Sequence, residues 1–384
     1  MSGYRSLHRE QILDDEAPIW QANAWSFSKS TQTDEWSVLT AAADGIVRVF
    51  RVREKEASDD LDASALAMTC THALLGTNQV FPPPSETPVL VGCSQCQMLR
   101  NYVGDDDMAG DIVVSAMEMT GRVRVWTFPD EELSVEVEVE VEDTPKLEDI
   151  PKQIRSQQQF VVEDATGTLM AVCPPNLSGN GDLTAAVACL DGSIAMVALG
   201  ISTPKAKKEA SVAGTVLDRW GTGSTPLSLC WHPSQLTIAV GRSDGLVEII
   251  PSTKKGQHRL THHSEPVRAI AFTPDGSLLV TCSDGGFLAV WDIVGAQKNM
   301  VHHVVNAHAS WILGVSALAD SRRFVTSGAD GKIHVWQLGT MHAPTHTFHT
   351  DHNNWTIALT KHREPQRLVS GSDNGWLQVF SLDG

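Results

Sequence analysis

The sequence has no apolar run that approaches the roughly 18 to 20 residues required of a membrane-spanning helix. Its first ten residues, MSGYRSLHRE, lack the apolar region of a secretion signal. The seven cysteines are an odd number and do not show the spacing of a disulfide framework. These absences predict an intracellular chain with reduced cysteines and no membrane partner.

Basic residues are also scarce. Lys and Arg total 29 against 46 Asp and Glu, which gives a formal net charge of −17 at pH 7. Binding to a phosphate backbone requires clustered Lys and Arg side chains. We therefore predict no direct nucleic-acid partner.

The sequence does contain one hairpin pattern that is repeated. In residues 324–336, FVTSGADGKIHVW, a strand of small residues is followed by an Asp-Gly turn and an alternating strand that ends in Trp. Similar segments occur at 38–50, 113–126, 183–197, 236–250, 278–291 and 367–380. The last four turn glycines lie 41, 45 and 44 residues apart, and a four-stranded propeller blade takes about 40 to 45 residues.

The predicted fold class is all-β, a seven-bladed β-propeller that occupies residues 1–384 as one domain, because radial stacking lets each blade cover the next. Longer intervals between the first copies predict insertions near 51–85, 128–158 and 201–225. The last copy ends at Phe380, with too few residues after it for a fourth strand. We therefore expect residues 4–13 to supply an N-terminal strand that closes the last blade.

The second insertion contains a strict alternation of Val and Glu at residues 135–142. A period of two predicts a strand with one apolar face and one acidic face. Such a strand fits a charged outer edge of the second blade, which resists edge-to-edge aggregation. It also fits an acidic contact for a basic partner segment.

Four polar or aromatic residues of the sixth copy are spaced as a set: His308, Thr326, Asp330 and Trp336. A hydroxyl, an imidazole and a carboxylate resemble a hydrolase triad. We interpret the set instead as a buried structural tetrad, in which hydrogen bonds run from indole to hydroxyl to imidazole to carboxylate. The fifth copy has Gly285 at the Asp position. The seventh copy has His352, Ser370, Asn374 and Phe380.

The residues of this set differ between the fifth, sixth and seventh copies. Side-chain packing tolerates such substitutions, whereas a catalytic site rarely does. The segment GRSDG at 241–245 matches a nucleophile-elbow pattern, but a strand follows it where an elbow needs a helix. The sequence therefore predicts no catalytic residues and no enzyme.

Two groups of possible metal ligands are present. Cys93 and Cys96 form a CxxC without a second pair, and structural zinc normally has four ligands, so we interpret both as core cysteines. The segment MHAPTHTFHTDH could bind a metal through four histidines, but it lies where an outer strand should alternate: His342, His346, His349 and His352. We predict no metal and no cofactor.

Tryptophans fall at two kinds of position. Trp126, Trp291 and Trp336 end third strands and are predicted to be core, whereas others begin first strands, near the channel mouth. Aromatic side chains at that mouth suit a binding hot spot, although they could instead plug the channel. We expect three kinds of residue to surround the mouth: those at the start of a first strand, those two positions further along, and those just before each turn Asp or its equivalent. The predicted partner-binding set is Trp20, Met119, Leu190, Arg268, Asp284, Trp311, Leu313, Trp355, Ile357 and Asp373.

The hairpins, the His residues before the first strands and the VW or VF strand ends resemble the WD-repeat family over nearly the whole chain. Three segments resemble, more narrowly, the WD-repeat subunits of superkiller complexes: DDEAPIWQANAWS, HSEPVRAIAFTPDGSLLVTCSDGG and AHASWILGVSALADSRRFVTSGADGKIHVW, the last followed by HTFHTDHNNW. Asp15 stands where that family has His. The middle copies, 51–225, match weakly.

That resemblance implies a noncatalytic scaffold that joins a tetratricopeptide-repeat protein and an RNA helicase, and so assists the cytoplasmic exosome in 3′ to 5′ mRNA decay. It implies a cytoplasmic and nuclear location. In some lineages the same subunit is similar to one shared with a polymerase-associated elongation complex or with the meiotic double-strand-break machinery. A substrate receptor of a cullin ubiquitin ligase is a further alternative, but Ile293 and Val294 follow Trp291-Asp292 where such receptors carry x-Arg.

Overall fold

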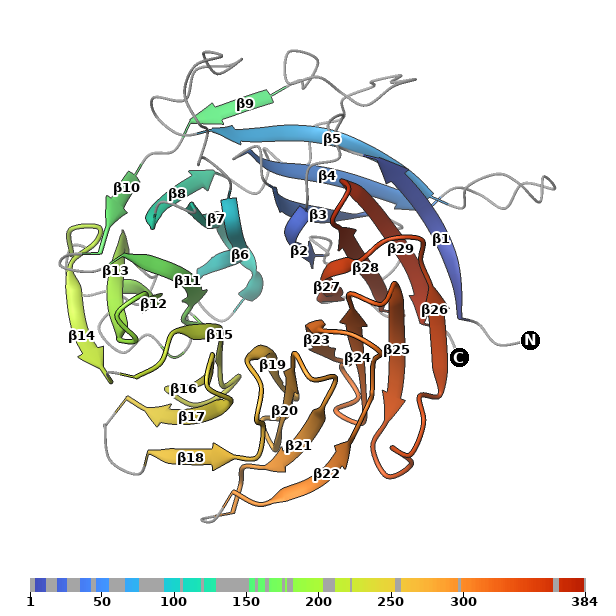
Figure 1. The fold of residues 1–384 in the computed structure, drawn as a ribbon. Helices are drawn as coiled ribbons and strands as arrows, with labels where there is room; N and C mark the ends of the chain where they lie inside the picture. Colours follow the sequence, from blue (N-terminus) through green and yellow to red (C-terminus); the bar gives the residue numbers. More distant parts are fainter. Residues whose placement is uncertain are drawn as a thin grey trace, which may run out of the picture.

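The computed structural model describes most of the chain. The described residues are 4–11, 19–25, 35–42, 46–54, 66–75, 93–103, 106–118, 121–128, 152–155, 158–162, 166–174, 177, 182–202, 211–221, 223–252, 257–295, 298–361 and 366–382. Their regular structure is β-strand, arranged as sheets around a common centre (Figure 1). Among them, no helix has the length and apolar character needed to cross a bilayer.

Five four-stranded antiparallel sheets contain the second to sixth hairpin copies. The second comprises β6 (Cys93–Val103), β7 (Asp106–Glu118), β8 (Arg122–Phe128) and β10 (Gln158–Val161). The third comprises β11 (Gly167–Val172), β12 (Asp182–Cys189), β13 (Ile194–Ser202) and β14 (Val216–Trp220). The fourth comprises β15 (Pro226–Trp231), β16 (Thr237–Arg242), β17 (Leu246–Pro251) and β18 (His258–Thr261).

The fifth and sixth sheets have the same order. The fifth comprises β19 (Val267–Phe272), β20 (Leu278–Ser283), β21 (Leu288–Asp292) and β22 (Met300–Val304). The sixth comprises β23 (Ile312–Ala317), β24 (Arg323–Gly328), β25 (Lys332–Gln337) and β26 (His346–His349).

The first and seventh copies share one nine-stranded sheet. Its order is β1 (Tyr4–Gln11), β29 (Trp376–Leu382), β28 (Arg367–Ser372), β27 (Asn354–Lys361), β2 (Ile19–Trp25), β3 (Glu35–Ala42), β4 (Val47–Glu54), β5 (Leu66–Leu75) and β9 (Lys152–Arg155). Two parallel pairs, Ala24 with Thr360 and Trp25 with Lys361, join β2 to β27. The described residues therefore form six hydrogen-bonded sheets where the sequence predicts seven blades.

The first strand of each copy lies innermost and contacts its neighbours. The contacts run from β2 through β6, β11, β15, β19, β23 and β27 and back to β2, so these strands form a closed circle (Figure 1). The second and third strands follow outward in each sheet. Neighbouring strands within each sheet are antiparallel. The starts of the inner strands and the turns between second and third strands therefore lie on the same face of the propeller, at one end of its central axis.

The predicted N-terminal strand pairs with the last copy. β1 runs antiparallel to β29, from Tyr4 opposite Leu382 to Gln11 opposite Trp376. The edge of β29 is thereby paired, and Leu7 is buried. The pairing covers most of the predicted segment, residues 4–11 of 4–13.

The core lies between neighbouring sheets. Nearly every residue of β24 is buried, because a strand covered on both faces has no solvent side. One core cluster contains Val290 from β21 and Trp336 from β25. The three tryptophans predicted to be core are buried: Trp126, Trp291 and Trp336.

The turn glycines meet a steric need that the hairpin pattern predicts. Gly331 has φ 70°, and a Cβ added there would lie 2.8 Å from the carbonyl oxygen of Thr350. A side chain at this turn would strain the backbone and push the following loop away.

The three predicted insertions contain strands in part. Within 51–85 the structure has β5, within 201–225 it has β14, and within 128–158 it has β9 and the start of β10. The outer strand of the second sheet is β10, which pairs with β8. The Val and Glu alternation at 135–142, predicted to be a strand, lies outside the described residues.

Candidate protein-interaction site

The four tetrad side chains of the sixth sheet form a chain of hydrogen bonds. Trp336 Nε1 donates to Thr326 Oγ1 over 2.9 Å, and His308 Nε2 lies 2.8 Å from the same oxygen. His308 Nδ1 lies 2.9 Å from Asp330 Oδ1. Thr326 is fully buried, so its hydroxyl is not accessible to a substrate.

Asp330 also fixes the loop that leads into β23. Its carboxylate accepts the backbone N–H of Ala309 over 3.0 Å. Burial alone would raise the pKa of Asp330, but hydrogen bonds and the charge of His308 lower it to about 2. The ionised carboxylate therefore holds the loop against the hairpin turn over the whole neutral range.

The fifth sheet has the same chain without its carboxylate. His263 Nε2 lies 2.7 Å from Thr281 Oγ1, and Trp291 Nε1 donates to that oxygen over 2.9 Å. Gly285 stands at the Asp position, and the buried Nδ1 of His263 has no hydrogen-bond partner among the described residues. Burial and the neighbouring His262 lower the pKa of His263 to about 4.

The seventh sheet departs from the expected set. The Ser370 hydroxyl donates to Asn354 Oδ1 over 2.9 Å, so Asn354 takes the place predicted for His352. His352 instead contacts Asn374 at 3.0 Å. Asn354 is the first residue of β27. The hairpin spacing does not identify this position, so the sequence analysis did not predict its role.

Three predicted face residues meet between the fifth and sixth sheets. Arg268 Nε donates to Asp284 Oδ1 over 2.6 Å, and its guanidinium carbon lies 5.1 Å from the centre of the Trp311 ring. Trp311 is 47% exposed, although an aromatic side chain of this size is usually well covered. We call Arg268, Asp284 and Trp311 the tryptophan cluster.

A second group of face residues lies on the seventh sheet. Trp355 is 38% exposed at the start of β27. Two residues before it, Asn353 Nδ2 donates to Asp373 Oδ2 over 2.6 Å. The hydrogen bond ties the turn of the last hairpin to the loop that presents Trp355.

The remaining predicted face residues have different outcomes. Leu190 is 58% exposed on the third sheet, and Leu313 is half-buried. The prediction for Ile357 is wrong, because this side chain is buried in the core cluster beside Gly314. The Trp20 side chain and Met119 lie outside the described part of the chain.

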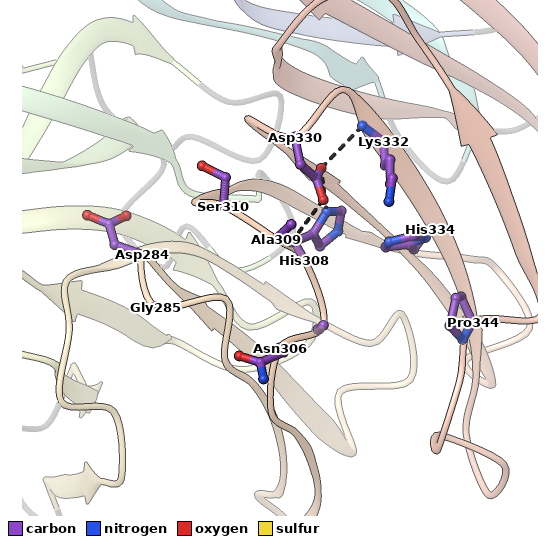
Figure 2. Close-up of a pocket in the computed structure, with 11 residues that line it drawn as sticks. Asp284, Gly285, Asn306, His308, Ala309, Ser310, Asp330, Lys332, His334 and Pro344 are labelled. Atoms are coloured by element: carbon purple, nitrogen blue, oxygen red, sulfur yellow. Dashed lines mark hydrogen bonds and ion pairs between the residues drawn. The ribbon is translucent and has the colours of Figure 1, made fainter.

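A pocket of about 640 Å³ opens beside the tryptophan cluster (Figure 2). Asp284 and Gly285 line one wall, and Asp330, Lys332 and His334 line another. Asp284 thus belongs both to the tryptophan cluster and to the pocket wall. The lining combines apolar surface with a few charged side chains, Asp284, Asp330 and Lys332, which suits a hydrogen-bonding or charged side chain from a partner.

The pocket contains a histidine that the sequence analysis did not single out. His334 lies with its ring centre 4.4 Å from that of His308, and its Nδ1 lies 2.8 Å from Thr347 Oγ1. Burial, with a smaller contribution from His308, lowers the pKa of His334 to about 4. His334 follows the turn glycine by three positions, where the fifth sheet has Ala289, so comparison of the copies could have found it.

The metal-ligand group in the described residues is His308, Asp330 and His334, whose ligand atoms lie within 4.8 Å of one another. It is not the group of four histidines considered from the sequence. Both ring nitrogens of His308 already take part in the tetrad. A metal ion would have to replace those hydrogen bonds. Cys93 and Cys96 belong to β6. Their side chains are not among those that the structure describes.

Sheets arranged in a circle, repeated hairpins and the Trp–Thr–His hydrogen-bond chain define an all-β WD-repeat propeller. The chain contains WD40 repeats: the family model described as "WD domain, G-beta repeat" matches residues 254–292 and 299–337. The first matched segment contains β18 to β21 and the second contains β22 to β25, so together they span most of the fifth and sixth sheets.

Parts of the chain are similar to parts of several curated proteins. The chain is 29% identical over 161 residues to COMPASS component SWD3 of Saccharomyces cerevisiae, covering 41% of this chain and 48% of that protein. It is 30% identical over 120 residues to WD repeat-containing protein 1 of Bos taurus, covering 30% of this chain and 19% of that protein. It is 26% identical over 113 residues to the Protein LST8 homolog of Drosophila melanogaster, covering 28% and 36%. Each match spans less than half of the relative.

Proposed function

We propose that the chain is a noncatalytic WD-repeat scaffold that binds another protein through the end of the propeller where the inner strands begin. The observation that carries this proposal is the tryptophan cluster. Trp311 is 47% exposed while Arg268, which is held by Asp284, contacts its ring. An exposed aromatic side chain that is already positioned loses little conformational entropy on binding, which is typical of a hot-spot residue.

The partner is proposed to be a short segment with apolar anchors and one basic side chain. Trp311 and Trp355 offer apolar surface, and Asp284 and Asp373 offer carboxylates beside them. In this proposal the basic side chain enters the pocket and meets Asp284 on its wall (Figure 2). The net charge of −17 also favours attraction of a basic segment.

The same proposal counts seven blades in the ring, with the nine-stranded sheet contributing the first and the last. Two features support this count. The inner strands that contact one another in a circle belong to seven hairpin copies. Only two residue pairs join β2 to β27. On either side of that junction, in β1, β29, β28 and β27 and in β2 to β5, neighbouring strands pair over most of their length.

The particular complex is proposed from sequence resemblance. The segments quoted above for the first copy and the last copies support a place in a superkiller complex. There the chain would hold a tetratricopeptide-repeat protein and an RNA helicase, in the cytoplasm and nucleus, and would assist the exosome in mRNA decay without binding RNA itself. A polymerase-associated elongation complex is the alternative that the same resemblance carries.

Affinity purification of the tagged chain from its native cell, followed by mass spectrometry, tests the assignment. Recovery of the helicase and the tetratricopeptide-repeat protein is the expected result. Elongation-complex subunits without the helicase would move the chain to that complex, and cullin adaptors alone would overturn both assignments.

A matched pair of variants links the result to the proposed face. Trp311→Ala removes the exposed aromatic of the tryptophan cluster. Leu236→Ala removes a similarly exposed apolar side chain at the turn between β15 and β16, at the opposite end of the strands. Loss of partners from the first variant but not from the second is expected.

A further inference from the structure

We propose that Arg9, on the N-terminal strand, is a positioning residue for the interaction face, because it holds the loop that presents Trp355. This inference rests on the proposed function of that face. It assigns β1 a role in partner binding in addition to its pairing with β29.

Arg9 reaches from β1 to the loop before β27 by several contacts. Its Nη1 donates to Asp351 Oδ2 over 2.7 Å, and its Nη2 lies 3.0 Å from His352 Nε2. The guanidinium carbon lies 4.4 Å from the centre of the Trp376 ring. A single side chain thus connects β1, β29 and the loop.

The loop is fixed on its other side by the last hairpin. His352 stacks on Trp376 with an interplanar angle of 9°, and it contacts Asn374. Asn353 donates to Asp373, and Asn354 accepts from Ser370. Residues 351–354 are therefore held between β1 and the hairpin, and Trp355 follows directly.

Arg9 is also the ion-pair partner of Asp351. Hydrogen bonding to Arg9, together with the charge of Arg9, lowers the pKa of Asp351. An exposed ion pair alone is weak. Beyond the ion pair, the Arg9 guanidinium lies over the Trp376 ring and contacts His352. A planar guanidinium makes both kinds of contact better than the ammonium group of Lys.

Coupling between the two sites is reciprocal by thermodynamic necessity. If Arg9 orders the Trp355 loop, partner binding must in turn favour the paired state of β1. A protein whose last sheet is closed by its N-terminal strand would then bind its partner most tightly in the closed form.

A double-mutant cycle in the full chain tests the inference, with the co-expressed tetratricopeptide-repeat subunit as the probe. Arg9→Ala should weaken capture by about threefold or more. In a Trp355→Ala background the same change should weaken capture no further, because Arg9 acts through Trp355. Arg9→Lys should restore part of the loss. Arg5→Ala, which removes an exposed cation from the same strand, should leave capture unchanged.

Hydrogen exchange of residues 350–355 in the free protein provides a separate readout. Faster exchange in Arg9→Ala than in Arg5→Ala is expected. Unchanged exchange and unchanged capture in Arg9→Ala, while Trp355→Ala loses capture, would overturn the inference and leave the proposed function intact. Full capture by Trp355→Ala would overturn the proposed face itself. An equal loss from Arg9→Ala in both backgrounds would show that Arg9 does not act through Trp355.

Discussion

Arg268 forms an ion pair with Asp284 in which Nε and Oδ1 are 2.6 Å apart, at the junction of the fifth and sixth sheets. The Arg268 side chain is 34% exposed and the Asp284 side chain 10% exposed. Removing the partly covered carboxylate would free Arg268 from the position in which it contacts Trp311. The ion pair thus explains how an exposed tryptophan is held in one place at this end of the propeller.

Trp336→Ala should lower the free energy of unfolding by about 3 to 5 kcal/mol, the usual effect of truncating a buried large aromatic. Trp336 is 1% exposed, and its loss also removes a hydrogen bond to the buried Thr326 hydroxyl. Urea unfolding measures the change. Trp311→Ala is the control and should unfold close to wild type. A wild-type unfolding curve for Trp336→Ala would show that the tetrad does not stabilise the sixth sheet.

Deletion of residues 1–13 should lower the melting temperature by several degrees. The deletion removes β1 with its buried Leu7, exposes the edge of β29 and uncovers the core residues of the same cluster, such as Leu377 and Val379. Differential scanning calorimetry compares it with a deletion of residues 1–3, which precede the strand. Equal melting temperatures for the two deletions would argue against closure by β1.

Gly285→Asp should stabilise the protein, increasingly so as the pH falls from 7.5 to 5. It places a carboxylate at the position from which Asp330 contacts His308 Nδ1 in the sixth sheet. The equivalent Nδ1 of His263 has no hydrogen-bond partner among the described residues. The added Cβ would lie 3.2 Å from Glu265 Cγ, a flexible side chain that can move. Satisfying a buried polar group should contribute about 1 kcal/mol.

The sign of the pH effect follows from proton binding. The pKa of His263 is about 4 in the folded protein, against roughly 6.5 in an unfolded chain. Between these values the unfolded state binds more protons, so wild-type stability falls as the pH is lowered. A carboxylate beside His263 raises its folded pKa and reduces that loss. Thermal melts at several pH values measure the difference in stability between Gly285→Asp and wild type. Gly285→Ala is the control for backbone entropy. A difference between the variants that does not grow at low pH would contradict this explanation.

The purified chain should show no RNA affinity below the micromolar range at physiological salt. The chain has a net charge of −17, and phosphate binding requires clustered cations. Fluorescence polarisation with a labelled single strand measures the affinity. Submicromolar binding that weakens steeply with salt would refute the expectation.

The repeats could be predicted from the sequence because each copy carries its own local signal. Gly331 and the alternation around it specify the hairpin, and Trp336 specifies the buried end of the strand. The pairing of β1 with β29 could be inferred because the last copy has no fourth strand of its own. Joining of the first and last copies into one sheet depends on contacts between Trp25 and Lys361, which no local pattern reveals.

The candidate site was predictable only in part. Position along an inner strand identified Trp311 and Trp355, but the same rule placed Ile357 on the face, whereas packing against Gly314 buries it. Neither the contact of Arg268 with Trp311 nor the contact of Arg9 with Asp351 follows from spacing, because each joins residues that lie far apart in the sequence.

The affinity of the Trp311→Ala, Trp355→Ala double variant for the tetratricopeptide-repeat partner tests the central claim most directly. Isothermal titration calorimetry should be combined with circular dichroism, because both side chains are exposed and the fold should persist. Each substitution is expected to weaken binding by about 2 kcal/mol or more, the threshold of a hot spot. A folded double variant that binds with wild-type affinity would contradict the claim that this end of the propeller is the interaction face.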